Sequence, residues 1–191
     1  IEALVRWKHP KHGLLSPDEF IPLAEQSGLI KPLTIWVLHN ALAECQKYIK
    51  NGHDIRVSIN LSMSNLTDLN FADEIIDILN QYDVSAGRLK LEITETALMD
   101  DPKAVIKALN RLNAIGLRIS IDDFGIGYSS LTYLQQLPVN ELKIDKSFGL
   151  SLVSDSNSVV IVRSTIDLAH KLGLRVVAEG VESQETLDLL Q

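Results

Sequence analysis

The stretch "LKLEITETALMD" (residues 89–100) indicates how the chain folds. Apolar residues alternate with polar ones from Leu89 to Thr94, which is the two-residue period of a β-strand with two different faces. The alternation then stops, and two carboxylates, Glu92 and Glu95, stand near the end of the strand. A strand needs no paired acids at its end for its own stability, so the pair indicates a functional site.

Segments of the same kind recur along the chain and alternate with segments that carry helical signals. We expect strands at residues 1–5, 55–61, 89–94, 117–121, 141–144 and 174–178. A capping box from Ser16 to Glu19 predicts a helix that Gly28 closes, and further helices are expected at residues 33–50, 71–81, 102–116, 156–172 and from 185 onward. The spacing of roughly thirty residues between strands is typical of repeated βα units with parallel strands.

Repeated βα units form either an open doubly wound sheet or a closed (β/α)8 barrel. Acidic or amide residues follow every predicted strand, and a barrel brings the carboxyl ends of all its strands to one face. We therefore expect an α/β fold, a modified TIM-type (β/α)8 barrel with about six βα units in this chain. Because such a barrel closes only with its full set of strands, we also expect residues 1–191 to be a single-domain fragment, with the first and last strands outside it.

The residues at the strand ends suggest a metal site. Oxygen ligands suit Mg²⁺ or Mn²⁺ better than zinc, and the five histidines show no zinc spacing. The positive charges of two divalent cations and Lys143 would balance the negative charges of five carboxylates. Two neighbouring metal ions are a recurrent device for phosphoester hydrolysis. Each acid alone could be a solvated strand end or a helix N-cap, but the pattern across six strands favours a site. The five carboxylates are Glu2, Glu92, Asp122, Asp123 and Glu179.

Composition narrows the classes of function. The chain has 191 residues, 46% of them hydrophobic, which suffices for one domain with a core. Its net charge of −7 excludes the binding of a nucleic acid polymer by general electrostatic attraction. The single cysteine, Cys45, lies on an apolar helical stripe, so we expect a core thiol in a reducing compartment. No apolar run is long enough to cross a bilayer, and we expect a cytoplasmic domain whose parent protein could be membrane-anchored.

Six short motifs carry a family resemblance: "EALVRW", "SINLS", "LEITET", "DDFGIGYSSLTYL", "LKIDKSF" and "VVAEGVE". Together and in this order they resemble the EAL-domain cyclic di-GMP phosphodiesterases, over the whole chain. The resemblance implies a modified TIM-type barrel that opens cyclic di-GMP to linear pGpG with two Mg²⁺ or Mn²⁺ ions. The letters DDFG also occur in protein kinases, but the sequence has no His-Arg-Asp catalytic loop and no glycine-rich phosphate loop of the kinase form.

The resemblance also implies roles for single residues. It places the metal ligands at Glu2, Asn60, Glu92, Asp122, Asp123 and Glu179. It implies that Lys143 contacts the attacking water, that Asp145 stands beside it, and that Glu179 is a ligand and also a candidate general base. Substrate contacts fall on Arg6, Leu4 and Glu182, and the planar fork of an arginine suits a phosphate well.

Glu95 resembles the acid that anchors the loop after the fifth strand of the family barrel. In the family that loop contributes to dimer contacts, so the resemblance implies a homodimer. Ile126 departs from the small or hydroxylated residue that the family often has in this loop. The resemblance further implies fused sensory or diguanylate cyclase domains in the parent protein.

Two other functions stay open at this point. A catalytically silent receptor or scaffold would bind cyclic di-GMP or a partner without turnover. Family members of that type usually lose several metal ligands, whereas this chain keeps every ligand that its length allows. An unrelated metal-dependent barrel, such as an aldolase or a lyase, would leave the six joint motifs unexplained.

Overall fold

The structure is a computed structural model that describes residues 1–68, 70–95, 102–125, 134–151 and 156–190. Its centre is a sheet of five parallel strands in the order β3-β4-β5-β6-β7. Sequence order and spatial order coincide, as repeated βα units require. The strands are β3 (Val57–Asn60), β4 (Leu89–Thr94), β5 (Arg118–Phe124), β6 (Glu141–Ile144) and β7 (Arg175–Ala178).

Five of the six predicted strands are therefore confirmed, and the first is only partly right. Near the N-terminus a single parallel bridge joins Glu2 to Ser58. Two hydrogen bonds support it, from the Ser58 N–H to the Ile1 carbonyl at 2.8 Å and from the Ala3 N–H to the Ser58 carbonyl at 2.9 Å. The chain then leaves the sheet to form an antiparallel hairpin of β1 (Trp7–His9) and β2 (Gly13–Leu15), which the sequence analysis did not predict.

The predicted helices are present with small shifts at their ends. In the predicted capping box, the Ser16 N–H donates to the Glu19 carboxylate at 2.7 Å. The second helix begins at Ile30, earlier than predicted, because Pro32 falls in the first turn, where no backbone N–H is needed. The α-helices are α1 (Pro17–Gln26), α2 (Ile30–Lys50), α3 (Met63–Leu66), α4 (Phe71–Tyr82), α5 (Pro102–Ala114), α7 (Lys146–Ser151), α8 (Ser156–Lys171) and α9 (Gln184–Leu190), with a 3-10 turn, η1, at Ala86–Arg88.

The core lies between the sheet and the helices on its outer side. Leu89, Leu91 and Ile93 are fully buried, and α2, α5 and α8 contact β3, β5 and β7 respectively. Cys45 is also fully buried, as predicted, and burial raises the pKa of its thiol. Since the apolar residues of β4 face the helices, the alternate residues Lys90, Glu92 and Thr94 face the concave side.

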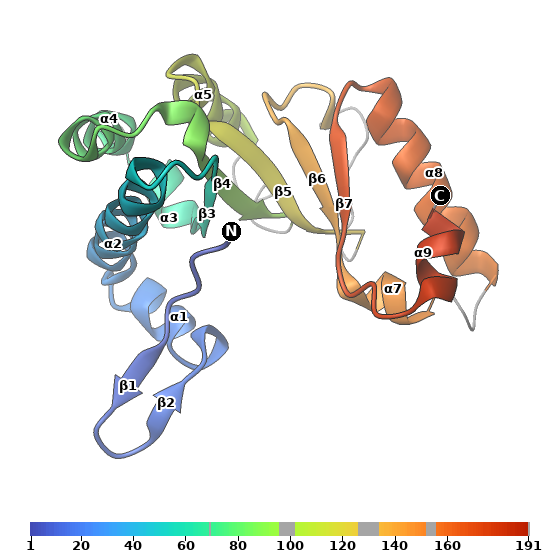
Figure 1. The fold of residues 1–191 in the computed structure, drawn as a ribbon, viewed down its shortest axis with the longest axis horizontal. Helices are drawn as coiled ribbons and strands as arrows, with labels where there is room; N and C mark the ends of the chain where they lie inside the picture. The colour runs from blue at the N-terminus through green and yellow to red at the C-terminus, as the bar shows by residue number, and fades with distance from the viewer. Residues whose placement is uncertain (69, 96–101, 126–133, 152–155, 191) are drawn as a thin grey trace.

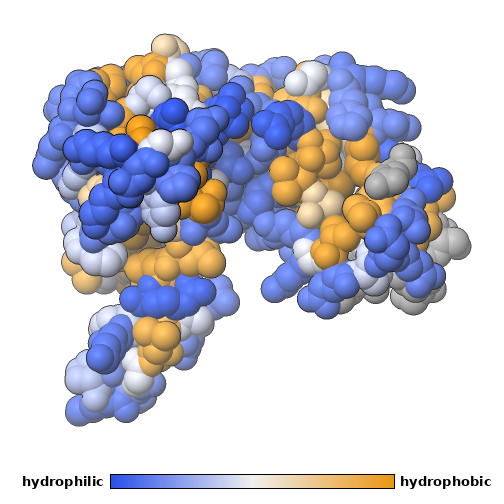
Figure 2. All heavy atoms as spheres, in the orientation of Figure 1, coloured by the Kyte–Doolittle hydropathy of each residue, from blue (hydrophilic) through white to orange (hydrophobic). Residues whose placement is uncertain are grey.

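Across the described ranges, the five strands curve as part of a TIM-type barrel but do not close (Figure 1). The hairpin β1–β2 and α1 extend from one side of the curved sheet, and α7 and α9 lie on the other side (Figure 1). Apolar side chains remain visible over the region of β6 and β7 (Figure 2). None of the helices in the described ranges has the length and apolar character that a membrane span requires.

Candidate active site

The strand registers bring the predicted polar residues to one end of the sheet. Asn60 of β3 stands opposite Glu92 of β4, and Thr94 of β4 stands opposite Asp122 of β5. Glu179 directly follows β7, and its N–H donates to the Ile144 carbonyl of β6 at 3.0 Å. Four of the five strands, β3, β4, β5 and β7, thus bring polar side chains to one end of the sheet, as the sequence analysis expected of a barrel.

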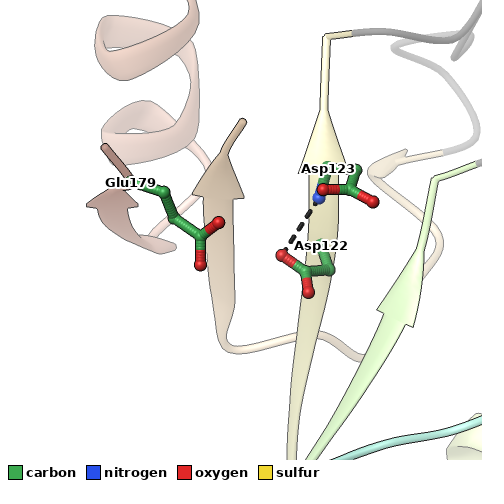
Figure 3. Close-up of side chains that lie close together, drawn as sticks. All are labelled: Asp122, Asp123 and Glu179. Carbon is green, nitrogen blue, oxygen red and sulfur yellow. Dashed lines mark hydrogen bonds between the residues drawn. The ribbon is translucent and has the colours of Figure 1, made fainter. Parts of the chain in front are cut away.

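Three carboxylates form the tightest group at this end. Asp122, Asp123 and Glu179 each offer an oxygen, and these oxygens all lie within 4.8 Å of one another. Figure 3 shows the Glu179 carboxylate reaching from the end of β7 toward the two aspartates of β5. This group could hold a metal ion, since its donors are all carboxylate oxygens.

Adjacent residues of a regular strand point to opposite faces, so the pair Asp122–Asp123 needs an irregular backbone. The pairing of β5 with β6 shifts between Ile121 and Phe124, and Asp123 has a φ of 52°, in the left-handed region. The Asp123 N–H also donates to its neighbour's carboxylate, Asp122 Oδ1, at 3.1 Å (Figure 3). This local bend explains how both side chains reach the same group.

Lys143 of β6 lies at the centre of the acidic residues. Its ammonium contacts Glu92 Oε2 at 2.9 Å, Asp122 Oδ1 at 3.0 Å and Glu179 Oε1 at 2.7 Å. The residue is 6% exposed, and burial alone would lower its pKa, but the three carboxylates outweigh burial and raise the pKa well above its usual range. Lys143 therefore stays protonated and can donate but not accept a proton.

The acids differ in how well they are neutralised. Burial raises the pKa of Asp122 above its usual value, although Lys143 opposes the shift. Burial, with the charges of Asp122 and Asp145, raises the pKa of Asp123 to about 6. Glu92 is different, because its two lysine partners outweigh burial and hold its pKa below the usual value. Negative charge around Asp122 and Asp123 thus exceeds what Lys143 compensates, and a divalent cation fits that surplus.

Two further contacts involve predicted site residues. The Asn60 side-chain amide donates to Glu2 Oε1 at 2.8 Å, which places Glu2 beside the end of β3. The Gly125 N–H donates to Glu95 Oε2 at 2.8 Å, and the Glu95 N–H donates to the Asp122 carbonyl at 3.1 Å. Glu95 therefore connects the end of β4 to the end of β5. The remainder of the predicted dimer loop, including Ile126, lies outside the described residues.

The remaining predicted site residues lie outside the group of three carboxylates. Asp145 follows β6 and accepts the Ser147 N–H at 2.8 Å; burial opposes its ionisation, but its hydrogen bonds, first of all with Ser147, keep its pKa low. Arg6 is exposed, and its guanidinium donates to the Val5 carbonyl at 2.8 Å. Leu4 lines a cavity of about 650 Å³ that Asn60 and Glu92 also line. Glu182 is exposed.

The sequence analysis missed part of the charged network. Lys90 of β4 contacts Glu92 Oε1 at 3.0 Å and also pairs with Glu141 of β6. A signal was present in the sequence, because Lys90 stands two residues before Glu92, and Glu141 two residues before Lys143. Residues two apart on a strand share a face, so the pattern predicts a lower tier of charges beneath the site.

Comparisons with known proteins show the family to which the chain belongs. The chain is 45% identical over 192 residues to the cyclic di-GMP phosphodiesterase NbdA and 42% identical over 191 residues to the bifunctional diguanylate cyclase/cyclic di-GMP phosphodiesterase MucR, both of Pseudomonas aeruginosa. The matches cover all of this chain but only 24% and 28% of those proteins, so the chain spans less than a third of their length.

A solved structure of the MucR phosphodiesterase in complex with c-di-GMP superposes with a TM-score of 0.93 at 42% identity, covering 99% of this chain and 77% of that one. The FimX EAL domain of the same organism, at 23% identity and a TM-score of 0.90, shows the same fold. The EAL domain family matches residues 1–191. Since the family model covers every residue of the sequence, the chain belongs to the EAL domain family.

Proposed function

We propose that this chain is the catalytic domain of a phosphodiesterase that hydrolyses cyclic di-GMP to linear pGpG and uses two Mg²⁺ or Mn²⁺ ions. The observation that carries the proposal is the group of Asp122, Asp123 and Glu179, whose oxygens lie within 4.8 Å of one another beside a buried lysine. The relatives named as phosphodiesterases, at more than 40% identity, support it.

The ligands that we propose come from the ends of β3, β4, β5 and β7 and from the N-terminal segment. When bound, the metal ions would activate water and stabilise negative charge on the phosphate. The three carboxylates of the described group have no zinc-type donors among them, and oxygen ligands suit Mg²⁺ or Mn²⁺. The proposed ligands are Glu2, Asn60, Glu92, Asp122, Asp123 and Glu179.

Three charged residues at the proposed metal site have further roles in the proposal. Lys143, which stays protonated, would orient the attacking water or a phosphate oxygen by donating a hydrogen bond. Asp145, which stays ionised next to Asp123, would hold that part of the site in place. Glu179 would accept the proton of the water if a carboxylate does so, because it borders both Lys143 and the aspartate pair.

The substrate would lie along the concave end of the sheet. The cavity of about 650 Å³ is of the size that small-molecule ligands occupy, and it borders Asn60 and Glu92. We propose that Leu4 contacts a base there, that Arg6 binds a phosphate with its remaining donors, and that Glu182 contacts the substrate from the other side. We also propose a cytoplasmic domain of a larger signalling protein, consistent with one buried, reduced thiol.

The alternative function is a receptor that binds cyclic di-GMP without turnover. Incubation of the protein with cyclic di-GMP and Mg²⁺, with the nucleotides resolved by chromatography, separates the two functions. Conversion to pGpG that disappears in Asp122→Asn supports the enzyme. Tight binding without conversion would leave the receptor as the function.

A further inference from the structure

Beneath the acidic group lies a second tier of polar side chains that the proposed function does not use. It consists of Lys90 on β4, Ser120 on β5 and Glu141 on β6, and the strand registers set Ser120 opposite both Glu92 and Glu141. Each member stands two residues before a member of the upper tier on its own strand. Both tiers therefore face the same concave side of the sheet.

The lower tier is connected and largely buried. The Lys90 ammonium donates to Glu141 Oε1, and the Ser120 hydroxyl donates to the same oxygen at 3.3 Å. The side chains of Lys90 and Glu141 are 20% and 11% exposed.

The two tiers meet at Glu92, which is 2% exposed. Lys90 holds its Oε1 at 3.0 Å and Lys143 holds its Oε2 at 2.9 Å. A carboxylate bonded at one oxygen can still rotate about its terminal bond, whereas a carboxylate bonded at both oxygens from two strands is fixed in its plane. Lys90 is in turn held by Glu141 from β6.

We propose that Lys90, held in place by Glu141, is a positioning residue that fixes the carboxylate plane of Glu92 for the metal centre. The inference rests on the proposed function, since it concerns a ligand of the proposed site. Lys90 acts through Glu92 and is not among the described residues that line the substrate cavity.

The test compares variants of the full-length protein by calorimetric titration with Mn²⁺ in the absence of substrate. Lys90→Met should weaken Mn²⁺ binding by roughly 10–100-fold, the usual effect of losing a residue that orients a metal ligand. Lys90→Arg, which keeps a cation at this position, should recover part of the affinity. Lys31→Met is the matched control, because it removes a 3.0 Å ion pair with Asp68 that lies outside the proposed site.

A second comparison separates positioning from stability. Lys90→Met alone leaves Glu141 buried without its cation, which destabilises a protein whatever the function of the pair. The double variant Lys90→Met with Glu141→Gln removes both charges and should regain thermal stability without regaining Mn²⁺ affinity. In turnover assays, kcat should fall in both variants while KM for cyclic di-GMP changes little.

The outcomes are distinct. If the wild type binds no Mn²⁺, the proposed function and this inference fail together. If the wild type binds Mn²⁺ and the double variant binds it equally well, the proposed function stands and the positioning role is wrong. If Lys90→Met does not fold, the double variant decides by the same criterion. If neither of them folds, Lys90→Arg is compared with Glu92→Gln. Lys90→Arg that binds Mn²⁺ no better than Glu92→Gln would also overturn the inference.

Discussion

Glu95 at the end of β4 bonds β5 on both sides of Asp123: its N–H donates to the Asp122 carbonyl at 3.1 Å, and its carboxylate accepts the Gly125 N–H at 2.8 Å. Glu95 is 2% exposed, so these bonds are formed away from water. Glu92, three residues earlier, is bonded instead to the two lysines of the site. The two glutamates of one strand end thus have different partners.

We expect Glu92→Gln and Glu95→Gln to fail in different ways. Glu92→Gln removes a negative charge from the proposed ligand set and should weaken metal binding directly. Glu95→Gln removes the charge that accepts the Gly125 N–H, so turnover should fall. Because the glutamine keeps an oxygen that can accept this N–H, metal affinity should weaken only in part, within the roughly 10–100-fold range of supporting residues. Calorimetric metal titration of both variants measures the difference, and indistinguishable titrations would contradict it.

Gly125 itself gives a test of the backbone at the end of β5. Its φ is 104°, and a Cβ built there would lie 2.7 Å and 2.9 Å from ring atoms of Phe148. Gly173 also has a positive φ, of 76°, but a Cβ there meets nothing within 4 Å. Gly173→Ala is therefore the control for backbone strain alone.

We expect Gly173→Ala to lower the free energy of unfolding by about 1–2 kcal/mol, the cost of a left-handed conformation for a residue with a Cβ. Gly125→Ala should lower it by at least about 1 kcal/mol more, because overpacking against the Phe148 ring adds to the strain. Urea unfolding of both variants supplies the measurement. Equal losses would show that the ring moves aside without cost.

The sequence predicted the regular parts of this fold well. The bounds of β4 and β6 are those expected, because their apolar residues alternate or run together over a short span. The hairpin β1–β2 was missed, since its two three-residue strands are mostly exposed and carry little hydrophobic pattern. The short helices α3 and α7 follow strands directly and are too short for a helical period.

The sequence predicted which residues form the site better than it predicted the contacts between them. Asp122, Asp123 and Glu179 were all predicted from their positions at the ends of strands. The left-handed backbone of Asp123 depends on the shifted register with β6, a tertiary feature that no local pattern encodes. The ion pairs of Lys90 were not predicted, because they join side chains of β4 and β6 that lie before the strand ends.

Metal specificity is the next expectation. Hydrolysis should require Mg²⁺ or Mn²⁺, and excess Ca²⁺ should inhibit it. Calcium prefers more ligands and longer bonds, so it should occupy an all-oxygen site without aligning the water. Assays of metal-stripped protein with each ion alone, and with Ca²⁺ added to Mg²⁺, measure this. Full turnover with Ca²⁺ as the sole divalent ion would exclude the proposed site geometry.

The raised pKa of Asp123 predicts how metal binding depends on pH. Its pKa lies near 6 in the folded, metal-free protein, against 3.8 for an unperturbed aspartate. Below pH 6 the carboxyl is protonated and cannot ligate, so Mn²⁺ affinity should fall about tenfold for each pH unit under 6 and level off above it. Calorimetry between pH 5 and pH 8, with Asp123→Asn as the variant that should lack the slope, provides the test.

The raised pKa of Asp123 also affects the stability of the metal-free protein. Metal affinity should rise with pH, whereas this contribution to stability should fall. A carboxyl whose pKa is raised by folding stabilises the folded state below its unfolded pKa and loses that contribution as pH rises through the folded value. The metal-free protein should therefore lose stability between about pH 4 and pH 6 from this group. Added Mn²⁺ should oppose the loss. A metal-free unfolding temperature that Asp123→Asn leaves with the same pH dependence would contradict this origin.

The last prediction concerns the open sides of the sheet. In the described ranges β7 pairs only with β6, and Val177 of β7 is 37% exposed. On the opposite side, the bridge from Glu2 to Ser58 is the outermost pairing. Parallel strands are normally buried on both faces, and open strands of this kind recruit other chains.

We propose that further strands of the parent protein complete the barrel, and we expect residues 1–191 prepared alone to self-associate and to hydrolyse cyclic di-GMP poorly. Glu2 and Glu179 belong to the two outermost segments, so fraying there would remove ligands from both sides of the proposed metal pair. Extending the chain at both ends should restore a monodisperse protein and turnover together, as measured by light scattering and pGpG formation. If residues 1–191 alone are a soluble monomer with the turnover of the extended protein, closure of the barrel is not needed for the site.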